Sequence, residues 1–112
     1  MAVEMSSDAG RVLIVDDEAT AVENLAHVCR KEAHDVTTRT TGMGAIEALE
    51  KNRFDVILTD LRMEKVDGMA VLRRAKELDP ETAVVLITGF ATLDSAVEAM
   101  KAGAFHYIAK PF

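Results

Sequence analysis

Cysteine, tryptophan and proline are scarce in this chain. Its 112 residues include one cysteine, two prolines, one tyrosine and no tryptophan. A single cysteine, Cys29, excludes an intramolecular disulfide and a metal site built from several cysteines. Because Cys29 follows Val22, Leu25 and Ala26 at helical spacing, we expect it to lie on the buried side of a helix.

Basic charge and long apolar runs are lacking too. The chain has 13 lysines and arginines against 19 aspartates and glutamates, a formal net charge of −6. This balance disfavours direct binding of nucleic acid by the domain itself. No apolar run approaches the roughly 20 residues that cross a membrane, and residues 1–10 lack the segments of a signal peptide. We therefore expect a cytoplasmic protein with no membrane partner, and a flexible N-terminal tail over residues 1–10.

What the chain does contain is a regular alternation of apolar strands and amphipathic helices. Strands are predicted at residues 12–15, 35–40, 54–59, 83–88 and 105–108. Helices are predicted at 18–31, between Thr41 and Asn52, at 68–78, and between Thr92 and Gly103. The last of these carries one apolar side, formed by Leu93, Ala96, Val97 and Met100. Strands apolar on both faces and joined by helices indicate an α/β fold, with a doubly wound parallel sheet.

A helix after the fifth strand is missing from this pattern. Covering that face with about four large apolar side chains would contribute ~6–12 kcal/mol, against a total domain stability of ~5–15 kcal/mol. We therefore expect residues 11–112 to be one domain excerpted from a longer protein, or a domain whose bare face a partner covers.

Polar residues stand where the predicted strands end. Asp16 and Asp17 follow the first strand, Asp60 follows the third, Thr88 ends the fourth and Lys110 follows the fifth. In open α/β sheets, ligands bind beyond the carboxyl ends of the strands. Clustered carboxylates repel one another, and Mg²⁺ prefers such oxygen ligands. The pattern therefore predicts a magnesium site. Beside the ion, an oxygen of Asp60 would attack phosphorus, and the Lys110 ammonium and the Thr88 hydroxyl would contact the phosphoryl oxygens.

Four motifs together resemble the receiver domain of two-component response regulators. They are Val-Asp-Asp-Glu at 15–18, Leu-Thr-Asp-Leu at 58–61, Ile-Thr-Gly at 87–89 and Lys-Pro-Phe at 110–112. The resemblance covers residues 11–112 and implies a flavodoxin-like sheet of five strands in the order 2-1-3-4-5. This strand order comes from the resemblance and not from the alternation of strands and helices. The segment 99–108 is similar to receivers that precede sigma-54 activators of the NtrC type.

The resemblance implies a role for each site residue. Asp60 is the phospho-acceptor, Thr88 the switch hydroxyl, Tyr107 the aromatic switch and Lys110 the phosphate-binding lysine. Magnesium is held by Asp16, Asp17, Asp60 and the backbone carbonyl of Arg62. Such a domain catalyses its own phosphorylation and dephosphorylation without being a conventional enzyme. Its implied partners are a sensor histidine kinase, a C-terminal output domain that controls transcription, and in some cases a second copy.

The sequence also departs from the family. Glu64 stands where the loop after the acceptor usually has proline, which predicts a more mobile loop. Family members differ in how fast the acyl phosphate hydrolyses, and the residues that line the path of water are here Arg62 and Phe90. Their bulk predicts a long-lived phosphorylated state.

Two other functions remain open on sequence grounds. An aspartyl-nucleophile phosphatase also uses an acidic Mg²⁺ site, but it places its nucleophile and acid two residues apart, unlike the stretch 16–19. A receiver-like module that binds a partner without phosphorylation would not require the complete set of reactive residues.

Overall fold

The fold is a single parallel sheet with helices on both faces. The computed structural model describes residues 10–32 and 34–110, so most of the predicted tail and the last two residues of the Lys-Pro-Phe motif lie outside it. The elements in chain order are β1 (Arg11–Val15), α2 (Ala19–Lys31), β2 (Asp35–Arg39), α3 (Gly42–Lys51), β3 (Val56–Thr59), α4 (Gly68–Leu78), β4 (Ala83–Thr88), α5 (Leu93–Lys101) and β5 (His106–Ala109). All pairings are parallel, and the strand order β2-β1-β3-β4-β5 confirms the predicted α/β class and topology.

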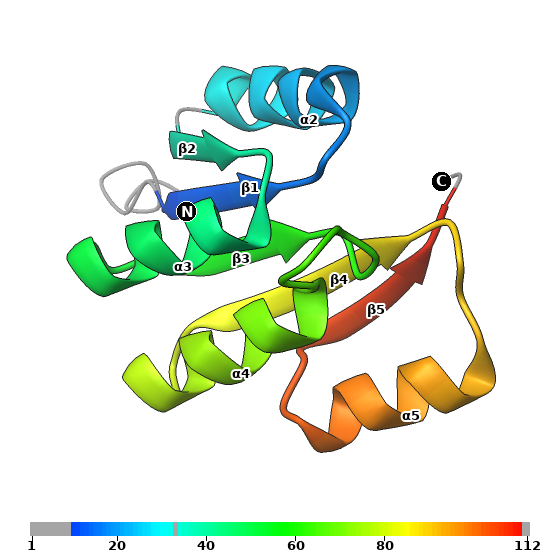
Figure 1. The fold of residues 1–112 in the computed structure, drawn as a ribbon. Coiled ribbons are helices and arrows are strands. Elements are labelled where there is room, and N and C mark those ends of the chain that lie inside the picture. The colour runs from blue at the N-terminus through cyan, green and yellow to red at the C-terminus, as the bar shows by residue number, and fades with distance from the viewer. Residues whose placement is uncertain (1–9, 33, 111–112) are drawn as a thin grey trace, which may run out of the picture.

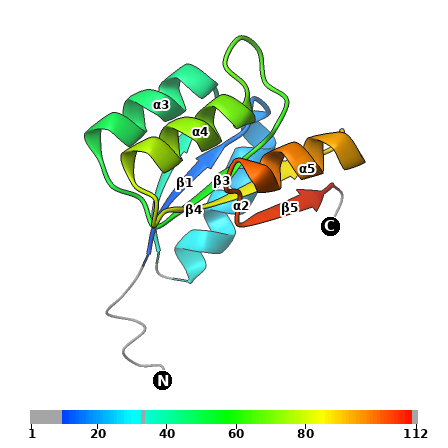
Figure 2. The ribbon, with the colours of Figure 1, turned by 90° about the horizontal axis from the view of Figure 1, so that it is seen from below.

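The helices divide unequally between the two faces of the sheet. Helix α2 lies on one face beside β1 and β2, whereas α3, α4 and α5 lie on the other (Figures 1 and 2). Alternate side chains of each strand point to opposite faces. Thus Leu13 and Ile57 join the large cluster under α3 and α4, while Val12 and Ile14 join a smaller cluster under α2. This alternation explains why the central strands are apolar at nearly every position.

The face that carries α2 is incompletely covered. A groove of about 370 Å³ lies there, and its apolar lining includes Leu25, Val28, Leu58 and Ile87. Val28 is 58% exposed. Cys29 packs against the small cluster, on the buried side of the helix as predicted, but it is only partly buried. The reason is that no other described helix lies over this side of the sheet.

Helix α5 rests on the sheet through very little surface. Ala99 is its one buried residue, while Leu93 is 79% exposed and Val97 and Met100 are also exposed. The apolar side predicted from the sequence therefore faces outward. By contrast, α4 buries Met69, Val71 and Leu72 together with two smaller residues. Since few side chains anchor α5, its position depends more on individual polar contacts than that of α4.

The strands otherwise begin and end close to their predicted limits. Phe54 is buried as expected, but β3 begins two residues later, at Val56. In the described part of the chain, no helix is long and apolar enough to cross a membrane.

Candidate functional site

The carboxyl ends of the strands are joined by backbone hydrogen bonds that continue the sheet. The Asp16 amide donates to the Arg39 carbonyl (3.3 Å), the Asp60 amide to the Val15 carbonyl (2.9 Å) and the Lys110 amide to the Thr88 carbonyl (2.9 Å). The site residues therefore stand on the rigid sheet, not on free loops. Their relative positions follow from the strand order.

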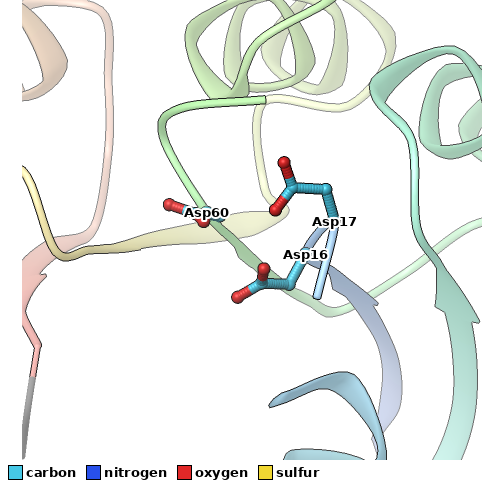
Figure 3. Close-up of side chains that lie close together, drawn as sticks. All are labelled: Asp16, Asp17 and Asp60. Carbon is cyan, nitrogen blue, oxygen red and sulfur yellow. The ribbon is translucent and has the colours of Figure 1, made fainter. Parts of the chain in front are cut away.

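The predicted acidic residues meet at this edge. Carboxylate oxygens of Asp16, Asp17 and Asp60 lie within 4.8 Å of one another (Figure 3). Asp16 is 3% exposed, whereas Asp17 is exposed and Asp60 intermediate. The Lys110 ammonium lies 2.9 Å from an oxygen of Asp16 and 3.7 Å from an oxygen of Asp60. Three carboxylates thus face one cation, which leaves the cluster with a surplus of negative charge.

The surplus charge affects both Asp60 and Lys110. Burial, followed by the charge of Asp16, raises the pKa of the Asp60 carboxyl, although Lys110 lowers it in part. Partial burial would lower the pKa of Lys110, but its hydrogen bond to Asp16 and the charge of Asp60 outweigh this and raise it. Lys110 therefore remains an ammonium at neutral pH, where the ionised form of Asp60 is disfavoured relative to a free aspartate.

The raised pKa of Asp60 predicts how the stability of the metal-free chain depends on pH. The folded chain binds the proton of the Asp60 carboxyl more tightly than the unfolded chain does. The contribution of this group to the stability of the fold is therefore complete below its unfolded pKa and is lost as the pH rises through its folded pKa. At pH 7, Asp60→Asn should therefore raise the thermal unfolding midpoint in a chelator-containing buffer. The difference should shrink on acidification below about pH 4, near the ordinary aspartate pKa.

Scanning calorimetry across this pH range, with and without Mg²⁺, checks that prediction. Added Mg²⁺ should stabilise the parent more than the Asp60→Asn variant. An equal midpoint for both proteins at pH 7 without metal would contradict the electrostatic account.

The loop between β3 and α4 is held close to the site by two glycines. A Cβ on Gly68 would lie 2.2 Å from the Asp60 carbonyl oxygen, and a Cβ on Gly42 would lie 2.1 Å from the Val66 carbonyl oxygen. The Gly68 amide also donates to the Leu61 carbonyl at 2.8 Å. The glycines thus permit two backbone approaches that close the loop, although Glu64 replaces the usual proline.

The residues two positions beyond Asp60 and Thr88 stack on each other. The Arg62 guanidinium lies 4.7 Å from the centre of the Phe90 ring, a cation–π distance. The Arg62 amide points to Asp60 (3.4 Å), and the Phe90 amide donates to the Thr88 hydroxyl oxygen (3.0 Å). The sequence singled out both residues, but their direct contact became visible only in the structure.

Tyr107 lies on β5, partly buried against the large cluster. Its hydroxyl bonds to the hydroxyl of Ser95 on α5, at 2.5 Å. Ser95 was not among the predicted site residues. The one local signal was a hydroxyl residue three positions after the cap Thr92, which is the spacing of a capping box.

Comparison with known proteins identifies the family. Residues 12–112 match the response regulator receiver domain. Transcriptional regulatory protein ZraR of Escherichia coli K12 is 35% identical over 107 residues, which cover 96% of this chain and 24% of ZraR. DNA-binding transcriptional regulator NtrC of the same organism is 37% identical over 103 residues, covering 92% of this chain and 22% of NtrC. The chain therefore spans about a quarter of the length of these relatives.

Solved structures agree with the fold and the sequence likeness. A receiver domain protein from Clostridium thermocellum superimposes with a TM-score of 0.84 at 36% identity, covering 91% of this chain and 82% of that one. The beryllofluoride-activated NtrC4 receiver domain dimer gives a TM-score of 0.84 at 35% identity, with 91% and 84% covered. With the fold, the strand-end residues and these matches in agreement, the chain belongs to the receiver domain family of two-component response regulators.

Proposed function

We propose that this domain accepts a phosphoryl group from a sensor histidine kinase onto Asp60, in a Mg²⁺-dependent reaction. The observation that carries the proposal is the set of three carboxylates within 4.8 Å of one another, faced by the Lys110 ammonium. An oxygen of Asp60 forms a bond to phosphorus, and the bond from phosphorus to the donor breaks with its electron pair leaving on the donor. The product is an acyl phosphate on Asp60.

The donor set fits a magnesium ion. The ion would be held by Asp16, Asp17, Asp60 and the backbone carbonyl of Arg62, because carboxylate and carbonyl oxygens are the ligands that it prefers. The three crowded carboxylates also need more positive charge nearby than Lys110 supplies. When bound, the ion neutralises charge on the phosphoryl oxygens. Lys110 contributes a second positive charge, and Thr88 offers a hydroxyl to a phosphoryl oxygen.

The proposed output of the reaction is a change of surface. The acyl phosphate draws the Thr88 hydroxyl toward itself, Tyr107 fills the space that is vacated, and the 89–108 surface shifts toward a second form. In a longer protein that surface would control a C-terminal output domain, in keeping with the transcriptional regulators among the relatives. The exposed apolar residues Leu93, Val97 and Met100 also offer a contact for a second copy. We place the protein in the cytoplasm, where such a kinase domain would meet it.

Intact-mass spectrometry distinguishes this function from its rivals. After incubation with Mg²⁺ and a small acyl-phosphate donor, the chain should gain the mass of one phosphoryl group. A module that works without phosphorylation would gain none. An aspartyl phosphatase would instead turn over an excess of phosphomonoester, which the proposed domain does not.

The stacked pair Arg62 and Phe90 predicts a slow loss of the phosphoryl group. A guanidinium and a ring in contact beside the acceptor hinder an attacking water more than two small polar side chains would. Arg62→Asn and Phe90→Glu should therefore each hydrolyse the acyl phosphate faster than the parent, by several-fold to tenfold. The decay of the phosphorylated mass after donor removal measures this rate. Faster decay in the parent than in either variant would defeat the prediction.

A further inference from the structure

The side chain of Ser95 is the centre of a small hydrogen-bond network at the start of α5. Its hydroxyl lies 2.9 Å from the Thr92 hydroxyl, 3.1 Å from the Thr92 carbonyl oxygen and 2.5 Å from the Tyr107 hydroxyl. The Thr92 amide also points to it at 3.3 Å. One side chain therefore joins the cap of α5 to the single tyrosine of the chain.

In the bond between Ser95 and Tyr107, either hydroxyl can be the donor. A serine hydroxyl has one proton to donate and two lone pairs that accept. The Ser95 hydroxyl is also within hydrogen-bond distance of the Thr92 carbonyl oxygen, which in addition accepts from the Ala96 amide at 3.0 Å. In either direction, the bond ties the Tyr107 hydroxyl to a side chain that also contacts Thr92, the residue before α5.

This bond matters because α5 has few other attachments. Ala99 is its one buried residue. The ion pair between Arg73 of α4 and Glu98 of α5, at 3.0 Å, joins two exposed side chains, and such pairs contribute little. Ser95 is more enclosed, and it shares with Asp17 and Arg62 the lining of a groove of about 440 Å³ beside the acceptor site.

We propose that Ser95 is a positioning residue that holds Tyr107 against α5 in the unphosphorylated chain, so that this bond opposes switching. The proposal rests on the proposed function in one respect, that Tyr107 moves when a phosphoryl group binds. In the present arrangement, the Thr88 hydroxyl accepts from the Phe90 amide, and Tyr107 remains on Ser95. In this proposal, movement of the ring toward Thr88 breaks the bond to Ser95.

The expected size of the effect follows from the bond that is lost. One hydrogen bond between neutral groups changes an equilibrium about two- to twelvefold. A ligand that favours the switched form then binds more tightly by the same factor, because less of its binding energy is used to shift the equilibrium. Ser95→Ala should therefore bind beryllium fluoride, a phosphoryl mimic, about two- to twelvefold more tightly in the presence of Mg²⁺.

The chain carries its own probe for this experiment. With one tyrosine and no tryptophan, its intrinsic fluorescence reports on Tyr107 alone. The fluorescence change on titration with beryllium fluoride gives the affinity. Acrylamide quenching without the mimic gives the exposure of the unphosphorylated ring, which should rise in Ser95→Ala because the ring loses its anchor.

Two matched variants separate the bond to Tyr107 from the helix cap. Ser95→Thr keeps the hydroxyl and should restore both the parent quenching and the parent affinity. Thr92→Ala removes the cap that accepts from the Ser95 amide but leaves the Ser95 hydroxyl able to bond to Tyr107, so its affinity should stay close to that of the parent.

Each outcome decides the proposal. Equal quenching in the parent and Ser95→Ala would show that Ser95 does not hold the ring. Unchanged or weaker binding of the mimic by Ser95→Ala would show that the bond does not oppose switching. If the parent itself binds no mimic, the proposed function fails, and the quenching comparison still decides whether Ser95 holds Tyr107.

Discussion

Asp60→Asn should gain no phosphoryl mass under conditions that fully load the parent chain. The amide has no anionic oxygen to attack phosphorus, and the substitution leaves no carboxylate at the end of β3. The effect should be all or none, because the substitution removes the nucleophile and not one of several stabilising contacts. Intact-mass spectrometry with Mg²⁺ and a small acyl-phosphate donor measures it directly.

Two further variants complete that experiment. Asp35→Asn changes an exposed aspartate at the start of β2, at the opposite end of the strands, and should load like the parent. Asp17→Asn should load more slowly and require more Mg²⁺, because it removes one of the clustered carboxylates. A phosphoryl adduct on Asp60→Asn would place the acceptor elsewhere, and its absence from the parent would reject the proposed function.

Gly68→Ala should impair both the fold and the site. The new Cβ would meet the Asp60 carbonyl oxygen at 2.2 Å and the Leu61 Cα at 2.8 Å, and both are backbone atoms that no rotamer change moves away. Crowding of this kind costs about 1–3 kcal/mol, which should lower the unfolding midpoint by roughly 5–15 °C. Because the relief moves the segment that carries Asp60, phosphorylation should slow by up to about a hundredfold.

Gly89→Ala is the matched control for this substitution. It also adds one methyl group to a glycine beside the site, but no atom lies within 4 Å of the position its Cβ would occupy. Its midpoint should stay within about 2 °C of that of the parent, as for surface changes that disturb no contact. Thermal unfolding followed by circular dichroism gives the midpoints, and the rate of mass gain gives the second effect. Parent-like values for Gly68→Ala in both measurements would contradict the argument.

The accuracy of the sequence predictions depended on the range of the interactions involved. Thr41 and Thr92 were recognised as helix caps because a cap bonds to backbone only a few residues away, and both accept such bonds in the structure. The outward apolar side of α5 was not foreseen. Its residues repeat at helical spacing, but which side of a helix is buried depends on what lies beside it in space.

The same distinction applies at the site. The strand ends predicted that Asp16, Asp17 and Asp60 would meet, because parallel strands bring their carboxyl ends to one edge of a sheet. The same reasoning placed Lys110 near these carboxylates, but its ion pair with Asp16, 94 positions away, was not predicted. The contact between Arg62 and Phe90 and the bond between Ser95 and Tyr107 were not predicted either, because each depends on side-chain directions that no local pattern specifies.

By itself, the sequence determined the order of strands and helices, the parallel sheet and the edge where the acidic residues gather. These depend on hydrophobic periodicity, helix caps and the position of polar residues at strand ends, all of which are local. The tertiary structure alone decided which apolar surfaces stay exposed, how closely Gly68 approaches Asp60, and what holds Tyr107. Those features arise where separate elements pack together, and packing depends on the shapes of both surfaces at once.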